Sequence, residues 1–155
     1  MKPAVTVRRG NRDDRDFVRD LGRRSATSNV SAVRVAKHDD VLDATERLTE
    51  FVFTRKHDAF IAEDDGERVG FLLVLYDFPD EVTLTEQAFF AYAAVEPHAR
   101  RRGVASALFA AAEERARAVG MQYVSLMVTE DNTPARTMYE TSGFVTERRM
   151  MTKVL

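Results

Sequence analysis

Residues 88–106 read AFFAYAAVEPHARRRGVAS, and this stretch decides the fold. Its first eight residues are continuously apolar, as expected of a strand whose sheet is covered on both faces. From Val104 the sequence becomes alanine-rich, with apolar side chains at helical spacing as far as Val119. Gly120 follows, where a left-handed residue would end a helix. We therefore predict a central strand joined to a long helix by a loop that contains three consecutive arginines.

The loop from Arg100 to Ala105 has the composition of an anion site. The first turn of a helix presents unpaired backbone N–H groups with partial positive charge, and Gly103 and Ala105 keep bulky side chains away from them. Three cations at a helix start oppose the helix dipole, and such a local conflict is expected at a functional site. A bound phosphate would relieve the conflict. The alternative is a solvated arginine-rich turn.

Hydrophobic spacing predicts the elements on either side of this stretch. Upstream we expect a strand at Val5 and Val7, a helix from Asn11 to Leu21, a second helix near residues 40–54, and a hairpin over residues 59–76 that turns at residues 64–67. Downstream we expect a strand over residues 121–128, a short helix with Thr133 as its N-cap and Pro134 at the first helical position, a stop at Gly143, and closing strands at residues 144–145 and 150–155.

This element order predicts one α/β domain (α+β in some classifications) over residues 1–155. The predicted core is a mixed, twisted sheet of about six to seven strands with helices on both faces. The chain length of 155 residues and a hydrophobic content of 45% are sufficient for one buried core.

Composition excludes several classes of protein. The net charge of -2 argues against a general nucleic-acid binder, because the phosphate backbone is held by positive charge. The absence of cysteine excludes disulfides and thiolate nucleophiles and agrees with a reducing cytoplasm. Residues 1–12 lack the apolar segment of a signal peptide, and no run has the length of a membrane helix. The three histidines lack metal-ligand spacing, so we expect no metal site. From the missing signal peptide and membrane helix and the absence of cysteine, we expect a cytoplasmic protein without membrane association.

A second block of residues follows the long helix. It consists of Asn132, Ala135, Tyr139 and the pair Gly143-Phe144. With Arg100, Gly103 and Ala105, this block resembles the two signature motifs of the GNAT superfamily of acetyl-CoA-dependent N-acetyltransferases. Two motifs in the correct order, with a strand and helix between them, are more specific than either alone. The hairpin and the opening strand-helix unit over residues 4–21 fit the same family, so the resemblance spans nearly the whole chain.

The resemblance implies acetyl-CoA as cofactor. It implies that the pantetheine arm lies along the end of the strand at residues 93–95 and that the pyrophosphate lies on the arginine-rich loop, where Arg102 and the hydroxyl of Ser106 would add donors. The residues that we expect in cofactor contact are Ala94, Val95, Arg100, Arg101, Arg102, Gly103, Val104, Ala105, Ser106, Asn132 and Tyr139. Core packing by the strand residues and helix capping by Asn132 are the alternatives.

Acetyl transfer from a thioester to an amine needs a base, a stabilised oxyanion and a proton for the leaving thiolate. The family often places a tyrosine at the position of Tyr139, which makes its phenol the expected proton donor, although a packing role would also explain it. Some members carry a glutamate in the strand before the phosphate loop, but residues 89–92 contain no carboxylate. Glu86 is the nearest upstream candidate base, and Glu96 follows the strand. Either could instead be a solvated charge.

Three hypotheses follow for function. The first is an N-acetyltransferase that acts on a primary amine of a small molecule or peptide. The second is a non-catalytic acyl-CoA-binding regulatory domain, and the third, least favoured, is a nucleic-acid-binding module that uses the three arginines. Residues 22–57 and 76–87 are expected to flank the acceptor, where acidic side chains would favour a cationic amine or would simply be solvated. These are Asp39, Asp40, Asp43, Asp80 and Glu81. The sequence leaves open whether the chain forms a homodimer.

Overall fold

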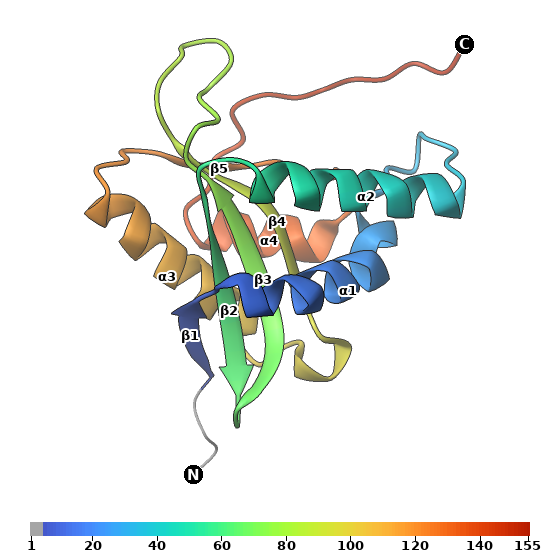
Figure 1. Ribbon diagram of the computed structural model, residues 1–155. Helices are drawn as coiled ribbons and strands as arrows, with labels where there is room; N and C mark the ends of the chain where they lie inside the picture. Colours follow the sequence, from blue (N-terminus) through green and yellow to red (C-terminus); the bar gives the residue numbers. More distant parts are fainter. Residues whose placement is uncertain (1–4) are drawn as a thin grey trace.

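The computed structural model describes residues 5–155 as a sheet with two layers of helices (Figure 1). The strands are β1 (Thr6–Arg9), β2 (His57–Asp64), β3 (Glu67–Leu75), β4 (Ala88–Val95) and β5 (Val124–Leu126), and they lie side by side in chain order. The first four are antiparallel, and β5 is parallel to β4. The expected domain and opening unit begin at residues 1 and 4, and the first four residues lie outside the described part of the chain.

The helices cover both faces of the sheet, as predicted (Figure 1). Helices α1 (Arg15–Ser25) and α2 (His38–Phe53) pack on one face, and α3 (Val104–Ala118) and α4 (Thr133–Thr141) pack on the other. Alternating side chains of β3 divide between the two cores, because successive residues of a strand point to opposite faces. Phe71 and Leu73 meet α1 and α2, whereas Leu72 and Val74 meet α3.

Two glycines allow the helices to approach the sheet closely. A Cβ at Gly22 of α1 would come within 3.1 Å of the Tyr92 ring, and the Tyr92 hydroxyl donates a buried 2.7 Å hydrogen bond to the Gly22 carbonyl. A Cβ at Gly70 of β3 would lie 3.1 Å from both the Ala94 carbonyl oxygen and the Val104 side chain. The start of α3 is therefore seated directly on the end of β4.

The pairing of β4 changes partway along the strand. Leu73 pairs with Tyr92 and Val74 pairs with Phe90, so Ala91 is an extra residue in β4. Such a bulge bends the strand that carries it and increases its twist. On the opposite side, β5 pairs with β4 only from Ala88 to Phe90. Within residues 5–155, no strand lies beside the edge of β4 from Ala91 to Val95 on the β5 side.

Most predicted elements are confirmed, and four details were wrong. The strand expected over residues 121–128 is paired only at residues 124–126, because the bulge turns β4 away from it. The closing strands at residues 144–145 and 150–155 are absent from the described chain, so the sheet has five strands rather than six or seven. The tail is instead held by an ion pair between Arg148 and Asp80, with Met150 and Met151 exposed. The N-cap of α4 is Asn132 rather than Thr133.

Two further features bear on earlier expectations. The 3-10 turn before α1 is capped by Asn11, whose side chain accepts a hydrogen bond from the Asp13 N–H. No helix within residues 5–155 combines the length and apolar character needed to cross a membrane.

Asp14, directly before α1, links this helix to Arg8 of β1 and so tests the packing of α1 on the sheet. Its buried carboxylate accepts hydrogen bonds from Arg8 at 2.8 and 2.9 Å and from the Asn11 N–H at 2.9 Å. The hydrogen bonds from Arg8 lower the pKa of Asp14 to about 2. The folded pKa is below the unfolded value, so the stabilisation is present above pH ~4 and is lost as pH falls toward 2.

We predict that Asp14→Asn lowers the free energy of unfolding by about 1–3 kcal/mol at pH 7. The difference from the parent should shrink as the pH falls from 5 to 3, and urea unfolding measured across this range checks it. The control is Asp16→Asn, at an exposed carboxylate whose removal should change stability by less than about 1 kcal/mol. A difference for Asp14→Asn that stays constant with pH would contradict this role of the carboxylate.

Candidate functional site

The candidate site begins where β4 and β5 separate. Beyond the last pair, Phe90 with Leu126, alternate N–H and C=O groups of residues 91–95 face an edge without a strand partner. Ala94 is buried on the α1 side and Val95 is half-buried toward α3. This opening can accept a linear ligand with amide groups, because such a ligand pairs with a free strand edge through the backbone. Ala94 and Val95, both predicted contacts, lie on this edge.

The arginine-rich loop lies at the end of this edge. A short 3-10 turn, η3 (Pro97–Ala99), follows β4, and the chain then reaches Gly103, the residue before α3. Gly103 has φ +78, and a Cβ there would meet no atom within 4 Å. No side chain caps α3, and the first helical bond is from the Ala107 N–H to the Gly103 carbonyl at 3.0 Å. The N–H groups of Val104, Ala105 and Ser106 therefore lack helical acceptors.

The three arginines of the loop differ in their contacts. Arg102 forms an ion pair with Asp64 at the end of β2, at 2.6 Å, and Arg100 donates to the Val95 carbonyl at 3.3 Å. Arg101 forms no ion pair or side-chain hydrogen bond with the described residues, and its φ of +60 is a left-handed conformation that costs a non-glycine residue about 1 kcal/mol. Arg102 therefore anchors the loop, whereas the charges of Arg100 and Arg101 have no carboxylate partner among the described residues, and Arg101 has no side-chain hydrogen bond either.

Glu96, considered above as a base, is part of the support for this loop. Its carboxylate receives two hydrogen bonds from Arg24 at the end of α1, at 2.6 and 2.9 Å. These bonds lower the pKa of Glu96 below its ordinary value. A carboxylate held in this way is a poor proton acceptor, so we assign Glu96 to the positioning of the loop.

Tyr139 lies on the α3 side of the separation point. Its ring stacks on Phe109 with 5.5 Å between centroids, and Phe109 in turn contacts Phe90, the last β4 residue paired with β5. Burial raises the pKa of Tyr139, so the phenol stays protonated at neutral pH. Its hydroxyl has no hydrogen-bond partner among the described residues. This phenol is in the correct protonation state to donate, although burial makes it a weaker acid.

Residues between β5 and α4 close the other side of the opening. The Asn132 side chain caps α4 by accepting from the Ala135 N–H at 3.4 Å, so the capping alternative is confirmed. The connection between α1 and α2 reaches the same segment: the Ala32 N–H donates to Asp131 at 2.7 Å, and the Thr129 hydroxyl donates to the Asn29 carbonyl at 2.8 Å. The opening is thus bordered by the α1–α2 connection as well as by α3 and α4.

The remaining predicted site residues lie farther from the opening or can contribute only a backbone group. Ser106 is exposed in the first turn of α3, and the Val104 side chain is buried, so Val104 can contribute only its N–H group. Glu86 is exposed two residues before β4, and about 16 Å of extended chain separates it from Ala91. Its role as a base stays a prediction. The Asp80 carboxylate is used within its own loop, where it accepts from Thr83 at 2.7 Å and pairs with Arg148 at 2.6 Å.

Comparison with known proteins identifies the family. Residues 24–144 match the sequence profile of the acetyltransferase (GNAT) family, so this chain belongs to that family. The uncharacterized N-acetyltransferase YhfO of Bacillus subtilis (strain 168) is 33% identical over 84 residues, which are 54% of this chain and 56% of that protein. The chain therefore spans about half the length of the curated relative that it matches.

Solved structures share the fold over the whole chain. A Pyrococcus furiosus protein, described only provisionally as an acetyl transferase, superimposes with a TM-score of 0.83 at 26% identity, over 98% of this chain and 100% of that one. The aminoglycoside N-acetyltransferase AAC(6')-Iy in complex with CoA has a TM-score of 0.71 at 20% identity, over 100% and 97%. A ribosomal-protein-alanine N-acetyltransferase from Brucella melitensis has a TM-score of 0.71 at 18% identity, over 98% and 99%. The last two likenesses show the fold alone.

The residues of this site fit coenzyme A. The uncapped N-terminus of α3 and the side chain of Arg101 offer backbone and charged donors for a pyrophosphate, and the free edge of β4 offers groups for the amides of a pantetheine arm. Gly103 allows the phosphate to approach, because it has no side chain in front of the helix. The expected contacts with coenzyme A are mainly made by backbone groups. Substitution of a side chain does not remove these groups.

Gly103 and Gly66 give a matched pair of substitutions. Both have positive φ, +78 and +82, and a Cβ at either would meet nothing within 4 Å. We predict that Gly103→Ala and Gly66→Ala each cost about 1 kcal/mol of stability, because both force a left-handed alanine. Only Gly103→Ala should weaken CoA binding, by about tenfold or more, as measured by calorimetric titration. Equal CoA affinity in the two variants would remove Gly103 from the phosphate site.

Proposed function

We propose that this chain is an N-acetyltransferase that transfers the acetyl group of acetyl-CoA to a primary amine of a small molecule or peptide. The observation that carries the proposal is the separation of β5 from β4 beyond Phe90, with the uncapped N-terminus of α3 at the end of the free edge. This arrangement binds the two ends of a pantetheine diphosphate through backbone groups. Family membership supplies the reaction class.

In the proposed mechanism, bound acetyl-CoA supplies an activated acyl thioester. A backbone N–H of the free β4 edge stabilises the negative charge that develops on the thioester oxygen when the amine attacks. Tyr139 donates its phenolic proton to the thiolate that leaves. With ordinary pKa values of ~10 for tyrosine and about 8.5 for a thiol, this transfer is uphill by roughly 2 kcal/mol, and burial adds to that figure. Tyr139 would therefore act by holding a hydrogen bond to the leaving sulfur before it gives up its proton.

Deprotonation of the amine is assigned to Glu86 acting through water, since no carboxylate occupies the β4 edge and Glu96 is held by Arg24. The acceptor is proposed only as a class. Two solved structures of the same fold carry names that specify different acceptors, an aminoglycoside in one and a ribosomal-protein alanine in the other. The fold thus serves both small-molecule and protein amines.

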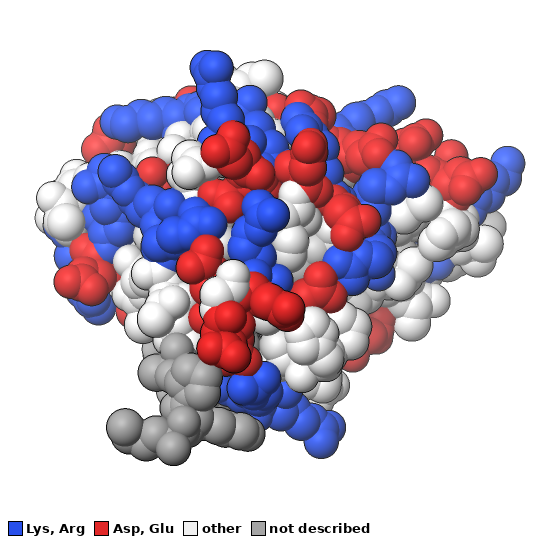
Figure 2. Space-filling model, turned by 60° about the horizontal axis from the view of Figure 1, so that its bottom comes forward, with Lys and Arg blue, Asp and Glu red and all other residues white. Residues whose placement is uncertain are grey.

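A non-catalytic acyl-CoA-binding regulator is the second candidate. It is favoured by one observation, the absence of a carboxylate from residues 88–95 of β4. It predicts tight CoA binding without turnover of any amine. Nucleic-acid binding is disfavoured, because basic and acidic side chains are interspersed over the face shown in Figure 2. Arg102, one of the three loop arginines, is also already paired with Asp64.

The direct test of the proposed function is release of free thiol from acetyl-CoA in the presence of an amine panel. Amino acids, polyamines, aminoglycosides and peptides with free N-termini cover the acceptor classes. We expect amine-dependent thiol release with at least one class and mass increase of the acceptor by one acetyl group. CoA binding without thiol release across the panel would favour the regulator.

Substitution of Tyr139 tests the proton donor. Tyr139→Phe should lower kcat by about a hundredfold and leave CoA affinity unchanged, because it removes only the phenolic proton. Its stability should change by less than about 1 kcal/mol, since the hydroxyl has no partner among the described residues. Tyr123→Phe is the control, at an exposed tyrosine beside β5. If both variants keep the kcat of the parent, Tyr139 only packs α4 on the sheet.

Substitution of Glu86 tests the base. Glu86→Gln should lower kcat/KM by about tenfold or more at pH values below the pKa of the acceptor amine, where a proton must be removed. At pH values above that pKa the two enzymes should converge, because the amine is already neutral. Glu81→Gln, in the same loop, is the control for nonspecific charge effects. Identical pH profiles for the parent and Glu86→Gln would exclude Glu86 as the base.

A further inference from the structure

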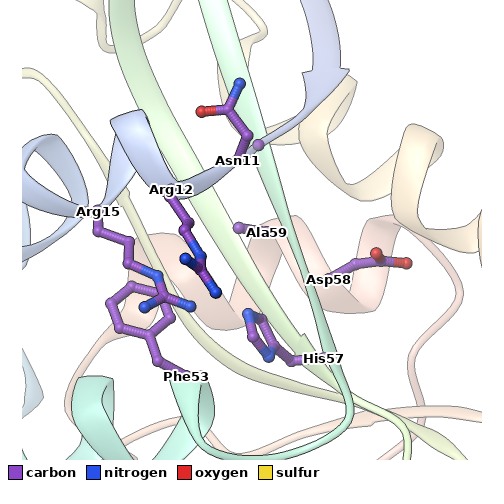
Figure 3. A pocket seen from close by; sticks show the side chains of 8 residues that line it. Asn11, Arg12, Arg15, Phe53, His57, Asp58 and Ala59 are labelled. Carbon is purple, nitrogen blue, oxygen red and sulfur yellow. The ribbon is translucent and has the colours of Figure 1, made fainter.

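A cationic hollow, separate from the candidate cofactor site, lies on the α1 side of the sheet. It is near the starts of α1 and β2 and the end of α2. It has a volume of about 180 Å³ and is bordered by Arg12, Arg15, Phe53 and His57. In Figure 3 the guanidinium groups of Arg12 and Arg15 and the imidazole of His57 point toward one space, with the Phe53 ring beside it. Three cationic or ionisable side chains from two separate segments therefore converge on one hollow.

The positive charge in this hollow is only partly offset: the hydrogen bond from Arg19 and the nearby charges of Arg19 and Arg15 lower the pKa of Glu50, but Glu50 is hydrogen-bonded to Arg19 alone. Neither Arg12 nor Arg15 forms an ion pair or a side-chain hydrogen bond with any described residue. The carboxylates on the same elements are used elsewhere: Asp14 by Arg8 and Arg68, and both Asp16 and Glu50 by Arg19. Asp13, the neighbour of Arg12, forms no ion pair with either arginine.

Asp58 also lines the hollow, but its carboxylate points away from the two arginines (Figure 3). Successive residues of β2 point to opposite faces, so His57 faces the hollow while Asp58 faces α3. There Asp58 accepts a hydrogen bond from the Tyr76 hydroxyl at 2.9 Å and pairs with Arg115 at 3.3 Å. An anion from solution would therefore meet the two arginines without competition from this carboxylate.

Two of the three donors are held in place. The Arg15 guanidinium lies over the Phe53 ring, 4.8 Å from its centroid, which restricts its rotation. The His57 Nδ1 lies 2.7 Å from the Arg55 carbonyl oxygen and donates to it, which leaves Nε2 for a ligand. Holding the donors before a ligand arrives lowers the entropic cost of binding.

We propose that this hollow binds the phosphate group of a small phosphorylated molecule. Two guanidinium groups supply paired N–H donors that match the oxygens of a phosphate, and Nε2 of His57 accepts from a P–OH group or, when protonated, donates to a phosphate oxygen. The volume is several times the ~30 Å³ share of one water, which leaves room for a body of a few carbon atoms against Phe53.

This site is separate from the arginine-rich loop. At one end of the sheet, His57 of β2 is in register with Leu75 of β3, which pairs with Phe89 of β4. At the other end, Ala62 of β2 is in register with Gly70 of β3, which pairs with Val95 of β4 next to the arginine-rich loop. The five residue steps from His57 to Ala62 span about 16 Å, so one pyrophosphate cannot occupy both sites. A ligand here would join the start of α1 and the end of α2 to β2.

The test is a titration of the CoA-saturated protein with inorganic phosphate and with glycerol phosphate, followed by NMR of the His57 side chain and the backbone amides of residues 12–15. Saturation with CoA keeps the probe off the arginine-rich loop. We expect saturable shifts at these positions, and little response to glycerol or to the dicarboxylate malonate. If the protein does not bind CoA, the proposed function fails separately, and the His57 signal in the free protein still reports on this site.

Variants decide whether the hollow is responsible. Arg12→Gln and Arg15→Gln should each weaken phosphate binding by about tenfold, and the double variant should abolish it, because each change removes charge-assisted hydrogen bonds. Arg47→Gln, at an exposed arginine of α2, is the matched control and should bind like the parent. Undiminished binding by the double variant with an unchanged fold, absence of any shift at millimolar phosphate, or equal binding of malonate would each overturn the proposal.

Discussion

The structure depends on the short pairing between β4 and β5. An inserted residue, Ala91, bends β4 after its third paired residue, and β5 keeps its partner only from Val124 to Leu126. Because unpaired backbone groups are costly when they are buried without a partner, an open strand edge in the middle of a fold is a place where a ligand completes the hydrogen bonding. The position of the cofactor site follows from this divergence.

Ionic and steric contacts then hold the anion loop at the end of that edge. Arg24 of α1 forms an ion pair with Glu96, and Arg102 of the loop forms one with Asp64 of β2. Gly70 has no side chain, so the start of α3 packs closely on β3 and β4. These contacts come from three different elements, so the backbone N–H groups of the first turn of α3 are positioned before an anion arrives. Such preorganisation makes backbone donors effective for binding and for stabilisation of developing charge.

Sequence patterns predicted the elements with strong periodicity and the arginine-rich loop that contains Gly103. They predicted both helical layers, the hairpin, β4 and α3, because apolar spacing reports directly on which face is buried. They missed the bulge at Ala91, since an extra residue inside a continuous apolar run leaves no break in the pattern. They also missed the partners of Glu96 and Arg102, which lie 72 and 38 residues away in the chain. The predicted closing strands failed because exposed apolar residues alone do not supply a pairing partner.

Amide hydrogen exchange with and without CoA tests the central claim most directly. If the cofactor completes the free edge of β4 and the first turn of α3, saturating CoA will slow exchange at amides within residues 91–95 and at Val104, Ala105 and Ser106. Amides of β1, at the far edge of the sheet, should be unaffected. CoA binding that leaves exchange at residues 91–95 and 104–106 unchanged would contradict the placement of the cofactor in this opening.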